Sequence, residues 1–147
     1  MKGILFLCVA NSARSQMAEG MARSLLPPHV KVWSAGSHPT SVRPEAISVL
    51  SEIGIDVSKH RSKSVAQIPA AEVDTVITLC GEEECPLFLG NVRRLHWGLP
   101  DPVAKDSMVS HEEKLARFRF VRDEISKRVA SLQIESGLDL QGEGKQE

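Results

Sequence analysis

Near the start of the chain, a cysteine and an arginine flank a short loop in the sequence CVANSARS, which runs from Cys8 to Ser15. The apolar run before Cys8 is typical of a central strand in a parallel sheet, and the residues after Arg14 have the apolar period of a helix. Backbone N–H groups at the start of a helix attract an oxyanion, and an arginine can bind two of its oxygens at once. The same positive field favours a thiolate. This pattern predicts that Cys8 attacks the central atom of an oxyanion held by Arg14.

The loop contains no glycine, so another residue must supply its turn. Asn11 is expected to adopt a left-handed backbone conformation, which asparagine tolerates better than most residues. We expect Ser15 to cap the helix and to direct its hydroxyl group toward the sulfur of Cys8. The predicted oxyanion-binding loop comprises Val9, Ala10, Asn11, Ser12, Ala13, Arg14 and Ser15. The alternative is that Cys8 is a buried strand residue and Arg14 a surface charge.

The composition is that of one soluble globular domain, with 147 residues, 41% of them hydrophobic and 25% charged. The formal net charge of −1 gives no electrostatic basis for binding nucleic acid or an anionic membrane. The apolar runs are too short to span a bilayer, and the N-terminus lacks the long apolar stretch of a signal peptide. We therefore expect a cytoplasmic protein. In that compartment, Cys8, Cys80 and Cys85 indicate catalysis, transient redox chemistry or metal binding rather than stable disulfides.

The order of the predicted elements favours an α/β fold, with a four-stranded parallel sheet flanked by helices on both faces. In such a fold, ligands bind at the carboxyl ends of the strands, where Cys8 lies. The predicted strands are residues 3–7, 30–35, 73–79 and 92–97, the last nearer an edge, and helices are predicted from Ser15, from Pro44 and over 110–132. We expect Ile53 on the buried side of the second helix. Residues 1–133 should form a single domain, and the polar residues 134–147 a flexible tail.

Several segments together carry a family resemblance: CVANSARSQMAEG, SAG at 34–36, GIDVSKHRS at 54–62, VITLC ending at Cys80, CP at 85–86 and HWGLPDP at 96–102. The chain resembles the thioredoxin-coupled arsenate reductases of the low-molecular-weight protein tyrosine phosphatase superfamily. The resemblance implies a phosphatase-like fold and an enzyme of arsenic detoxification that reduces arsenate to arsenite. Phosphate and sulfate are expected as competing oxyanions, thioredoxin as the reductant, and no cofactor or metal.

The resemblance also implies a relay of thiols. Cys8 attacks arsenate, Cys80 attacks Cys8 as arsenite leaves, and Cys85 moves the disulfide to Cys80–Cys85, where thioredoxin reduces it. In a helix, five residues would separate the last two α-carbons by about 7.5 Å of axial rise. A disulfide needs less than about 6.8 Å. We therefore expect the segment CGEEEC to be a mobile, non-helical loop; without the relay, Cys80 would be a small buried apolar side chain.

Two further sites follow from the resemblance. Asp101 stands where the superfamily places the general acid that protonates the departing oxygen, although an Asp-Pro turn is the alternative. Some family members bind potassium through an asparagine, a glutamate, a serine and an aspartate. Asn11, Glu19 and Ser34 match three of these, whereas Lys63 stands at the fourth position. We expect its ammonium group to replace the cation.

Two other functions stay open at this point. A low-molecular-weight protein tyrosine phosphatase would use Cys8, Arg14 and Asp101 alone, although the chain has no tyrosine to line a phosphatase cleft. A thiol-based metal or arsenite sensor would use Cys80 and Cys85 as ligands, with His96 or His111 added. The sequence also leaves open whether glutaredoxin or mycothiol replaces thioredoxin.

Overall fold

The computed structural model describes residues 1–81, 85–88, 90–103 and 108–145, with side chains up to residue 135. Four parallel strands form one sheet in the order β2-β1-β3-β4, which confirms the predicted architecture. The strands are β1 (Gly3–Cys8), β2 (Lys31–Gly36), β3 (Thr75–Thr78) and β4 (Arg93–His96). The helices are α1 (Arg14–Leu25), α2 (Pro44–Ser51) and α3 (His111–Lys145), with the short 3-10 helices η1 (Val65–Gln67) and η2 (Ala70–Glu72).

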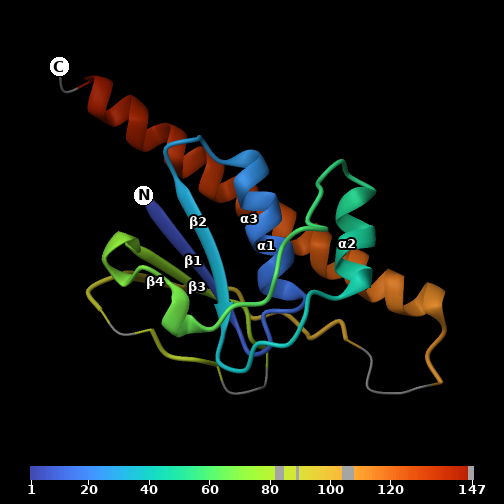
Figure 1. Ribbon diagram of the computed structural model, residues 1–147. Helices are drawn as coiled ribbons and strands as arrows, with labels where there is room; N and C mark the ends of the chain where they lie inside the picture. The colour runs from blue at the N-terminus through green and yellow to red at the C-terminus, as the bar shows by residue number, and fades with distance from the viewer. Residues whose placement is uncertain (82–84, 89, 104–107, 146–147) are drawn as a thin grey trace.

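The two faces of the sheet are covered unequally. Ile4 and Phe6 of β1 belong to a large core that includes residues of all three α-helices. Leu5 and Leu7 belong to a smaller core, covered by the chain around η1 and η2 and by Phe88. Figure 1 shows α3 passing behind the sheet, on the opposite side from the two 3-10 helices. Helical residues therefore cover both faces, but the three helices predicted from the sequence all pack on one face, and the other face carries only the single turns η1 and η2.

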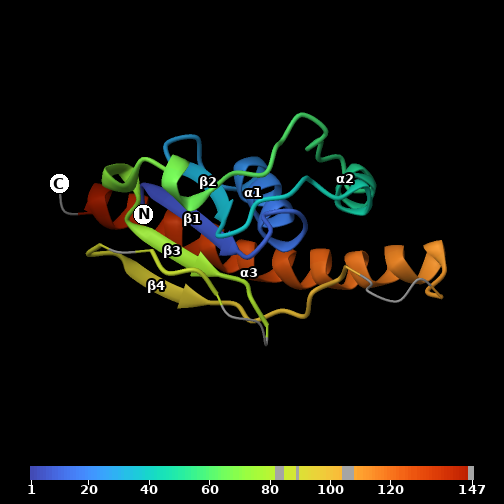
Figure 2. The same ribbon diagram turned by 60° about the horizontal axis from the view of Figure 1, so that its bottom comes forward.

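Strand β1 is the best anchored element, and it positions Cys8. Its residues Ile4 to Leu7 are all 0% exposed. Full burial of such a side chain contributes roughly 1.5–3 kcal/mol. All strands of the sheet point in the same direction, so their carboxyl ends meet at one end of the molecule (Figure 2). Cys8 therefore emerges from a fixed strand into the loops at that end.

Neighbouring strands approach Cys8 closely from both sides. Cys8 lies opposite Gly36 of β2, and Leu7 lies opposite Thr78 of β3. A Cβ atom on Gly36 would lie 2.3 Å from the carbonyl oxygen of Val9, so only glycine permits this approach. Cys80 follows two residues after Thr78, and it therefore leaves the sheet at the same end as Cys8.

Two expectations about the helices are corrected by the structure. Ile53 is 46% exposed rather than buried, because α2 ends at Ser51 and Gly54, with φ of 81°, turns the chain away. Helix α3 continues to Lys145 instead of ending near Leu132. No proline follows Leu132 to interrupt the backbone hydrogen bonds, so a polar sequence can extend the helix. The flexibility of residues 134–147 and the domain boundary before them stay predictions.

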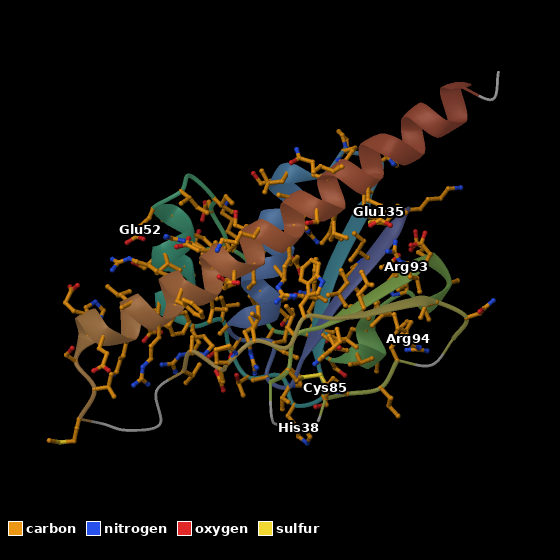
Figure 3. All side chains as sticks on the ribbon, turned by 180° about the vertical axis from the view of Figure 1, so that it is seen from behind. His38, Glu52, Cys85, Arg93, Arg94 and Glu135 are labelled. Atoms are coloured by element: carbon orange, nitrogen blue, oxygen red, sulfur yellow. A yellow bond between two sulfur atoms is a disulfide. The ribbon has the colours of Figure 1, made fainter. Side chains whose placement is uncertain are left out.

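A cluster of charges joins α2 to α3. The side chain of Glu52 accepts hydrogen bonds from Arg119, at 2.7 Å from Nη2, and from Arg122, at 2.7 Å from Nη1. Arg122 also donates to the carbonyl oxygen of Val49 at 2.9 Å. These hydrogen bonds from the two guanidinium groups lower the pKa of Glu52 to about 2. Figure 3 shows Glu52 beside α3.

The outer strand β4 lies at an edge of the sheet, as its charges predict. Arg93 and Arg94 are exposed, and Arg93 pairs with Glu135 of α3 (Figure 3). Arg94 donates to the carbonyl oxygen of Gly90 at 3.1 Å. Among the described residues, no helix has the length and apolar content needed to cross a membrane.

Candidate active site

The loop between β1 and α1 encloses a small cavity at the carboxyl end of the sheet. The cavity has a volume of about 260 Å³. Its lining residues are Cys8, Val9, Ala10, Ser12, Ala13, Arg14 and Asp101. The structure thus brings the predicted nucleophile, arginine and acid to one cavity, although Asp101 is 93 residues away from Cys8 along the chain. A volume of this size suits a small oxyanion.

Carbonyl groups of the loop are turned away from this cavity by hydrogen bonds from outside the loop. Three of these carbonyl oxygens accept from backbone N–H groups: Val9 from His38 at 2.9 Å, Ala10 from Thr40 at 3.1 Å and Ser12 from Arg43 at 2.9 Å. The carbonyl oxygen of Asn11 accepts from the hydroxyl of Ser62 at 2.6 Å. The N–H groups of residues 10–13 donate to no other described residue. Successive N–H groups released in this way form a concave anion site. The loop is therefore suited to bind the oxygens of a tetrahedral anion.

Asn11 provides the turn that the sequence predicts. Its φ of 49° makes it the one described residue other than glycine with a positive φ. The side-chain oxygen accepts from the N–H of Lys63 at 2.8 Å and from Gln16 Nε2 at 2.9 Å. Since a backbone N–H can only donate, Asn11 Oδ1 faces Lys63, and Nδ2 faces the other way, toward Ser15 and Ser34. The amide thus has a fixed orientation next to the cavity.

The Cys8 thiol is free, 3% exposed, and in contact with a hydroxyl group. Its sulfur lies 2.8 Å from Ser15 Oγ, which itself accepts a hydrogen bond from Asn11 Nδ2 at 2.7 Å. When Cys8 is a thiolate, it has no proton to give, so Ser15 is the donor. The predicted hydroxyl–sulfur contact is confirmed. The predicted cap is wrong, because α1 begins at Arg14 and its N-cap is Ala13, with no side-chain hydrogen bond.

Arg14 is buried and held by the two segments that border the cavity. It is 4% exposed, and Nη1 donates to the carbonyl oxygens of Leu79 at 3.3 Å and Leu99 at 2.9 Å. Leu79 precedes Cys80, and Leu99 lies two residues before Asp101. The guanidinium group therefore holds the oxyanion loop against the residues after β3 and against the segment that contains Asp101. The alternative that Arg14 is a surface charge is wrong.

Asp101 lies at the mouth of the cavity and also forms a local turn, so the two alternatives do not exclude each other. Its exposed side chain lines the cavity, and Oδ1 accepts from the N–H of Val103 at 3.0 Å, which makes a local turn. A carboxyl group held by a turn at the mouth of an oxyanion site is in place to exchange a proton with an oxygen of the ligand. Its role as general acid stays a prediction.

Cys80 and Cys85 form a disulfide with an α-carbon separation of 5.7 Å. Cys80 is 1% exposed, whereas Cys85 is partly exposed. Figure 3 shows Cys85 at the same end of the molecule as His38, whose N–H binds the loop. The segment is not helical at either cysteine, which agrees with the geometric requirement for the bond. Residues 82–84, and with them the predicted mobility of this loop, lie outside the described residues.

The residues matched to a potassium site do not fit a bound cation. Lys63 Nζ lies 3.3 Å from Glu19 Oε1, where a cation would need room. Asn11 turns Nδ2, not its oxygen, toward Ser34 at 2.9 Å. A hard cation requires oxygen ligands, and here one ligand is reversed and an ammonium group is already present. Within the described part of the chain, no group of three or more His, Cys, Asp or Glu residues could hold a metal ion.

Sequence reasoning missed five residues that support this site. His38, Thr40 and Arg43 contribute backbone N–H groups, which leave no signal in side-chain type. Gln16 and His60 lie behind the loop, with His60 Nδ1 at 3.3 Å from both Gln16 Oε1 and Glu19 Oε2. Burial lowers the pKa of His60, and the carboxylate of Glu19 opposes this shift only in part. Gln16 stands within CVANSARSQMAEG and His60 within GIDVSKHRS, and these two segments were the available signal.

Known proteins are similar to this chain in sequence and in fold. The sequence model of the low molecular weight phosphotyrosine protein phosphatases matches residues 3–141. The chain belongs to this family. A curated relative named arsenate reductase, from Halalkalibacterium halodurans, is 45% identical over 130 residues, which cover 87% of this chain and 92% of the relative.

Solved structures of family members have the same fold. An arsenate reductase described in its phosphate binding state has a TM-score of 0.74 and 35% identity, with coverage of 92% of this chain and 98% of that one. A thioredoxin-dependent arsenate reductase from Corynebacterium glutamicum has a TM-score of 0.72 and 27% identity, with coverage of 95% of this chain and 63% of that one. The fold of this chain is therefore similar to that of solved arsenate reductases.

Proposed function

We propose that this protein is an arsenate reductase that uses Cys8 as nucleophile and Cys80 and Cys85 as a disulfide relay. One observation carries the proposal: a free, buried thiol lines an oxyanion-sized cavity at the same end of the sheet as a disulfide between the two remaining cysteines. A phosphatase of this family would need the cavity but not the disulfide. The names of the similar proteins support the same activity.

In the first step, arsenate lies in the loop, with its oxygens bound by backbone N–H groups and by Arg14. The thiolate of Cys8, stabilised by the hydroxyl of Ser15, attacks arsenic and forms a sulfur–arsenic bond. One arsenate oxygen leaves as water after Asp101 supplies a proton. Arsenic stays pentavalent in this step, because no electrons have yet been transferred to it.

Reduction occurs in the second step. The thiolate of Cys80 attacks the sulfur of Cys8, and the electron pair of the sulfur–arsenic bond passes to arsenic, which leaves as trivalent arsenite. Cys8 and Cys80 are then joined by a disulfide. The thiolate of Cys85 attacks Cys80, and Cys8 leaves as a thiolate. The described structure, with Cys8 free and Cys80 bonded to Cys85, corresponds to the product of this exchange.

The cycle closes when an external dithiol reduces Cys80–Cys85, and we propose thioredoxin for this role. Cys85 is the more exposed sulfur and lines a second cavity, of about 240 Å³, with Pro86 and Leu87, which is 83% exposed. Support also comes from the thioredoxin-dependent reductase of similar fold. The proposal further includes phosphate and sulfate as competing oxyanions, a reaction without a resident cofactor, and a cytoplasmic location.

The proposal is tested by arsenate-dependent oxidation of NADPH with thioredoxin and thioredoxin reductase. We expect turnover with this system and none when glutathione and glutaredoxin replace it. The double variant Cys80→Ser/Cys85→Ser is the matched control, because it keeps the oxyanion loop intact. Equal arsenate turnover by the double variant would contradict the relay.

A phosphatase is the second candidate, and the family match is the observation that favours it. Hydrolysis of an aryl phosphate requires Cys8, Arg14 and Asp101 but no second thiol. Full phosphatase activity in the Cys80→Ser/Cys85→Ser variant, together with absent arsenate turnover in the unmodified protein, would select this function. The sensor alternative is disfavoured because the disulfide occupies both of the thiols that it needs as ligands.

A further inference from the structure

We infer that Lys63 is a positioning residue for Cys8, because its ammonium group serves as a cation built into the chain and orders a line of hydrogen bonds that ends on the Cys8 sulfur. The inference rests on the proposed function only in taking Cys8 as the nucleophile. It concerns a residue that touches neither the oxyanion cavity nor the disulfide. Lys63 lies in the chain between α2 and η1, 55 residues after Cys8.

Lys63 holds this line at two points. Its Nζ lies 3.3 Å from Glu19 Oε1, and its backbone N–H donates to Asn11 Oδ1 at 2.8 Å. The Glu19 side chain is 2% exposed and that of Lys63 20% exposed, so this ion pair is largely shielded from water. The backbone contact is independent of the side chain. A substitution at Lys63 therefore removes the ammonium group while it leaves the grip on Asn11.

The direction of each hydrogen bond follows from the chemistry of the groups. A carboxylate only accepts, so Ser34 donates its proton to Glu19 Oε1 at 2.6 Å, the same oxygen that Lys63 approaches. Ser34 Oγ is then an acceptor for Asn11 Nδ2 at 2.9 Å. The second proton of that amide goes to Ser15 at 2.7 Å.

The last bond of the line reaches the reacting sulfur. Because Ser15 Oγ accepts from Asn11, its own proton is available for Cys8, whose sulfur lies 2.8 Å away. Every proton in the line is therefore assigned when Glu19 is a carboxylate: one N–H of Asn11 donates toward Glu19 through Ser34, and the other donates toward Cys8 through Ser15. Each assignment fixes the next one, so a cation that holds Glu19 in place at one end helps to orient the hydroxyl of Ser15 at the other end.

The other charged groups near Glu19 do not replace Lys63. Arg23 lies 3.4 Å from Oε2, but its side chain is 52% exposed and well screened by water. His60 lies 3.3 Å from the same oxygen, and burial lowers its pKa, which favours the neutral ring. Two other charged residues, Arg14 and Asp101, line the cavity of Cys8. Lys63 is thus the shielded cation of the cluster.

The test uses alkylation of Cys8 by iodoacetamide at pH 7, in a Cys80→Ser/Cys85→Ser background where it is the only thiol. This readout needs no arsenate turnover, so it fails or succeeds independently of the proposed function. The variants are Lys63→Met, which removes the charge, and Lys63→Arg, which keeps it. Lys31→Met is the matched control, because Lys31 pairs with Glu72 on the surface at the other end of β2. Circular dichroism identifies the temperature range in which all variants are folded.

We expect Lys63→Met to slow alkylation roughly fivefold, on the scale of one partly lost charge-assisted hydrogen bond. Lys63→Arg should retain most of the rate, and Lys31→Met all of it. The unmodified protein should react equally fast in potassium chloride and in tetramethylammonium chloride at the same ionic strength. An unchanged rate in folded Lys63→Met, or an equal loss in Lys31→Met, would overturn the inference. Stimulation of the unmodified protein by potassium would do so as well, because the ammonium group would then not fill the place of a cation.

Discussion

The loop of Cys8 and the segment of Cys80 and Cys85 lie at the same end of the sheet, yet they are built in opposite ways. The first follows a strand with no exposed residue, and its carbonyl groups are held by donors from two other parts of the chain, residues 38–43 and Ser62. The second leaves the short strand β3 and passes from a buried cysteine to a partly exposed one. Leu87, only two residues after Cys85, is 83% exposed.

The difference follows from what each sulfur must do. A nucleophile that attacks a bound anion gains from donors that are already oriented before the reaction begins. A relay must carry an oxidised sulfur pair from the interior to a protein-sized reductant. For that purpose, one end of the pair has to be reachable from solvent. The molecule thus separates a fixed chemical site from an exit route, and substitutions in the two regions should produce different kinds of failure.

The largest effect is expected from Cys8→Ser, which removes the nucleophile itself. Arsenate turnover should fall below detection, since a serine hydroxyl is not ionised at neutral pH and no sulfur–arsenic bond can form. Turnover is measured by NADPH oxidation in the thioredoxin system. The Cys80–Cys85 disulfide should still form under an oxidant, and peptide mapping under non-reducing conditions checks this. Residual arsenate reduction at more than a trace would contradict the role of Cys8.

Cys85→Ser should stop the catalytic cycle after the first arsenite has been released. Each molecule should release one arsenite and retain a Cys8–Cys80 disulfide, because the exit thiol is missing. Single-turnover detection of arsenite, together with mass spectrometry of the trapped disulfide, measures this outcome. Cys80→Ser is the control, and it should release no arsenite. Repeated turnover by Cys85→Ser would show that the exit route is not needed.

Asp101→Asn distinguishes the role of Asp101 as a general acid from its role in the local turn. The amide oxygen can still accept from the N–H of Val103, so the local structure is preserved while the exchangeable proton is lost. We expect kcat to fall about 100-fold, at the lower end for removal of a general acid, with little change in the binding of phosphate as a competitor. Asp123→Asn, a change in an exposed residue of α3, is the control. A matched loss in phosphate binding would point to a structural role instead.

Gly36→Ala tests the rigidity of the loop. The added Cβ would lie 2.3 Å from the carbonyl oxygen of Val9, so the loop or β2 must shift. A displacement on the order of 1 Å near a reacting group reduces turnover by up to about 100-fold. Gly54→Ala is the control, because Gly54 has a φ of 81° but no atom within 4 Å of an added Cβ. It should lower the melting temperature without reducing kcat, and equal kinetics of the two variants would argue against a fixed loop.

The smallest effect is expected from Glu52→Gln, which lies outside both regions. The pKa of Glu52 is lowered in the folded protein from 4.5 to about 2, so its contribution to stability is present above pH 4.5 and is lost as the pH falls toward 2. The variant should melt at a lower temperature at pH 7 and should lose less stability on acidification than the unmodified protein. Calorimetry from pH 7 to pH 3 measures this, with Glu124→Gln as a control, since Glu124 pairs with the exposed Lys127. Altered arsenate kinetics would show that α2 and the loop are coupled.

The sequence predicted the elements of the fold well where apolar periodicity decides the structure. The segment 3–7 is apolar throughout and is the central strand, and the charged segment 92–97 is the edge strand. The predicted end of α3 was wrong because the polar sequence after Leu132 contains no proline to stop the helix. Ile53 was misplaced because the pattern does not show that Gly54 turns the chain before another helical turn forms.

The candidate site was predictable in its residue types but not in its supports. Cys8, Arg14 and Asn11 follow local rules about helix starts and backbone conformation, and these rules hold in the structure. The donors that turn the loop carbonyls away come from His38, Thr40 and other backbone groups, whose positions depend on the whole chain path. Ser15 illustrates the limit, because its contact with sulfur was predicted while its position inside the helix was not.

The unpaired edge of β4 affects whether the protein aggregates at high concentration. An outer strand offers unpaired backbone groups on which a second molecule could add its own strand, which is the usual start of aggregation. Arg93 and Arg94 place two positive charges on that side, and any pair of identical edges would bring four of them together. The bond from Arg93 to Glu135 also ties this strand to α3. We therefore expect the folded protein to stay dispersed at high concentration, and to begin to self-associate when these two arginines are replaced by β-branched apolar residues.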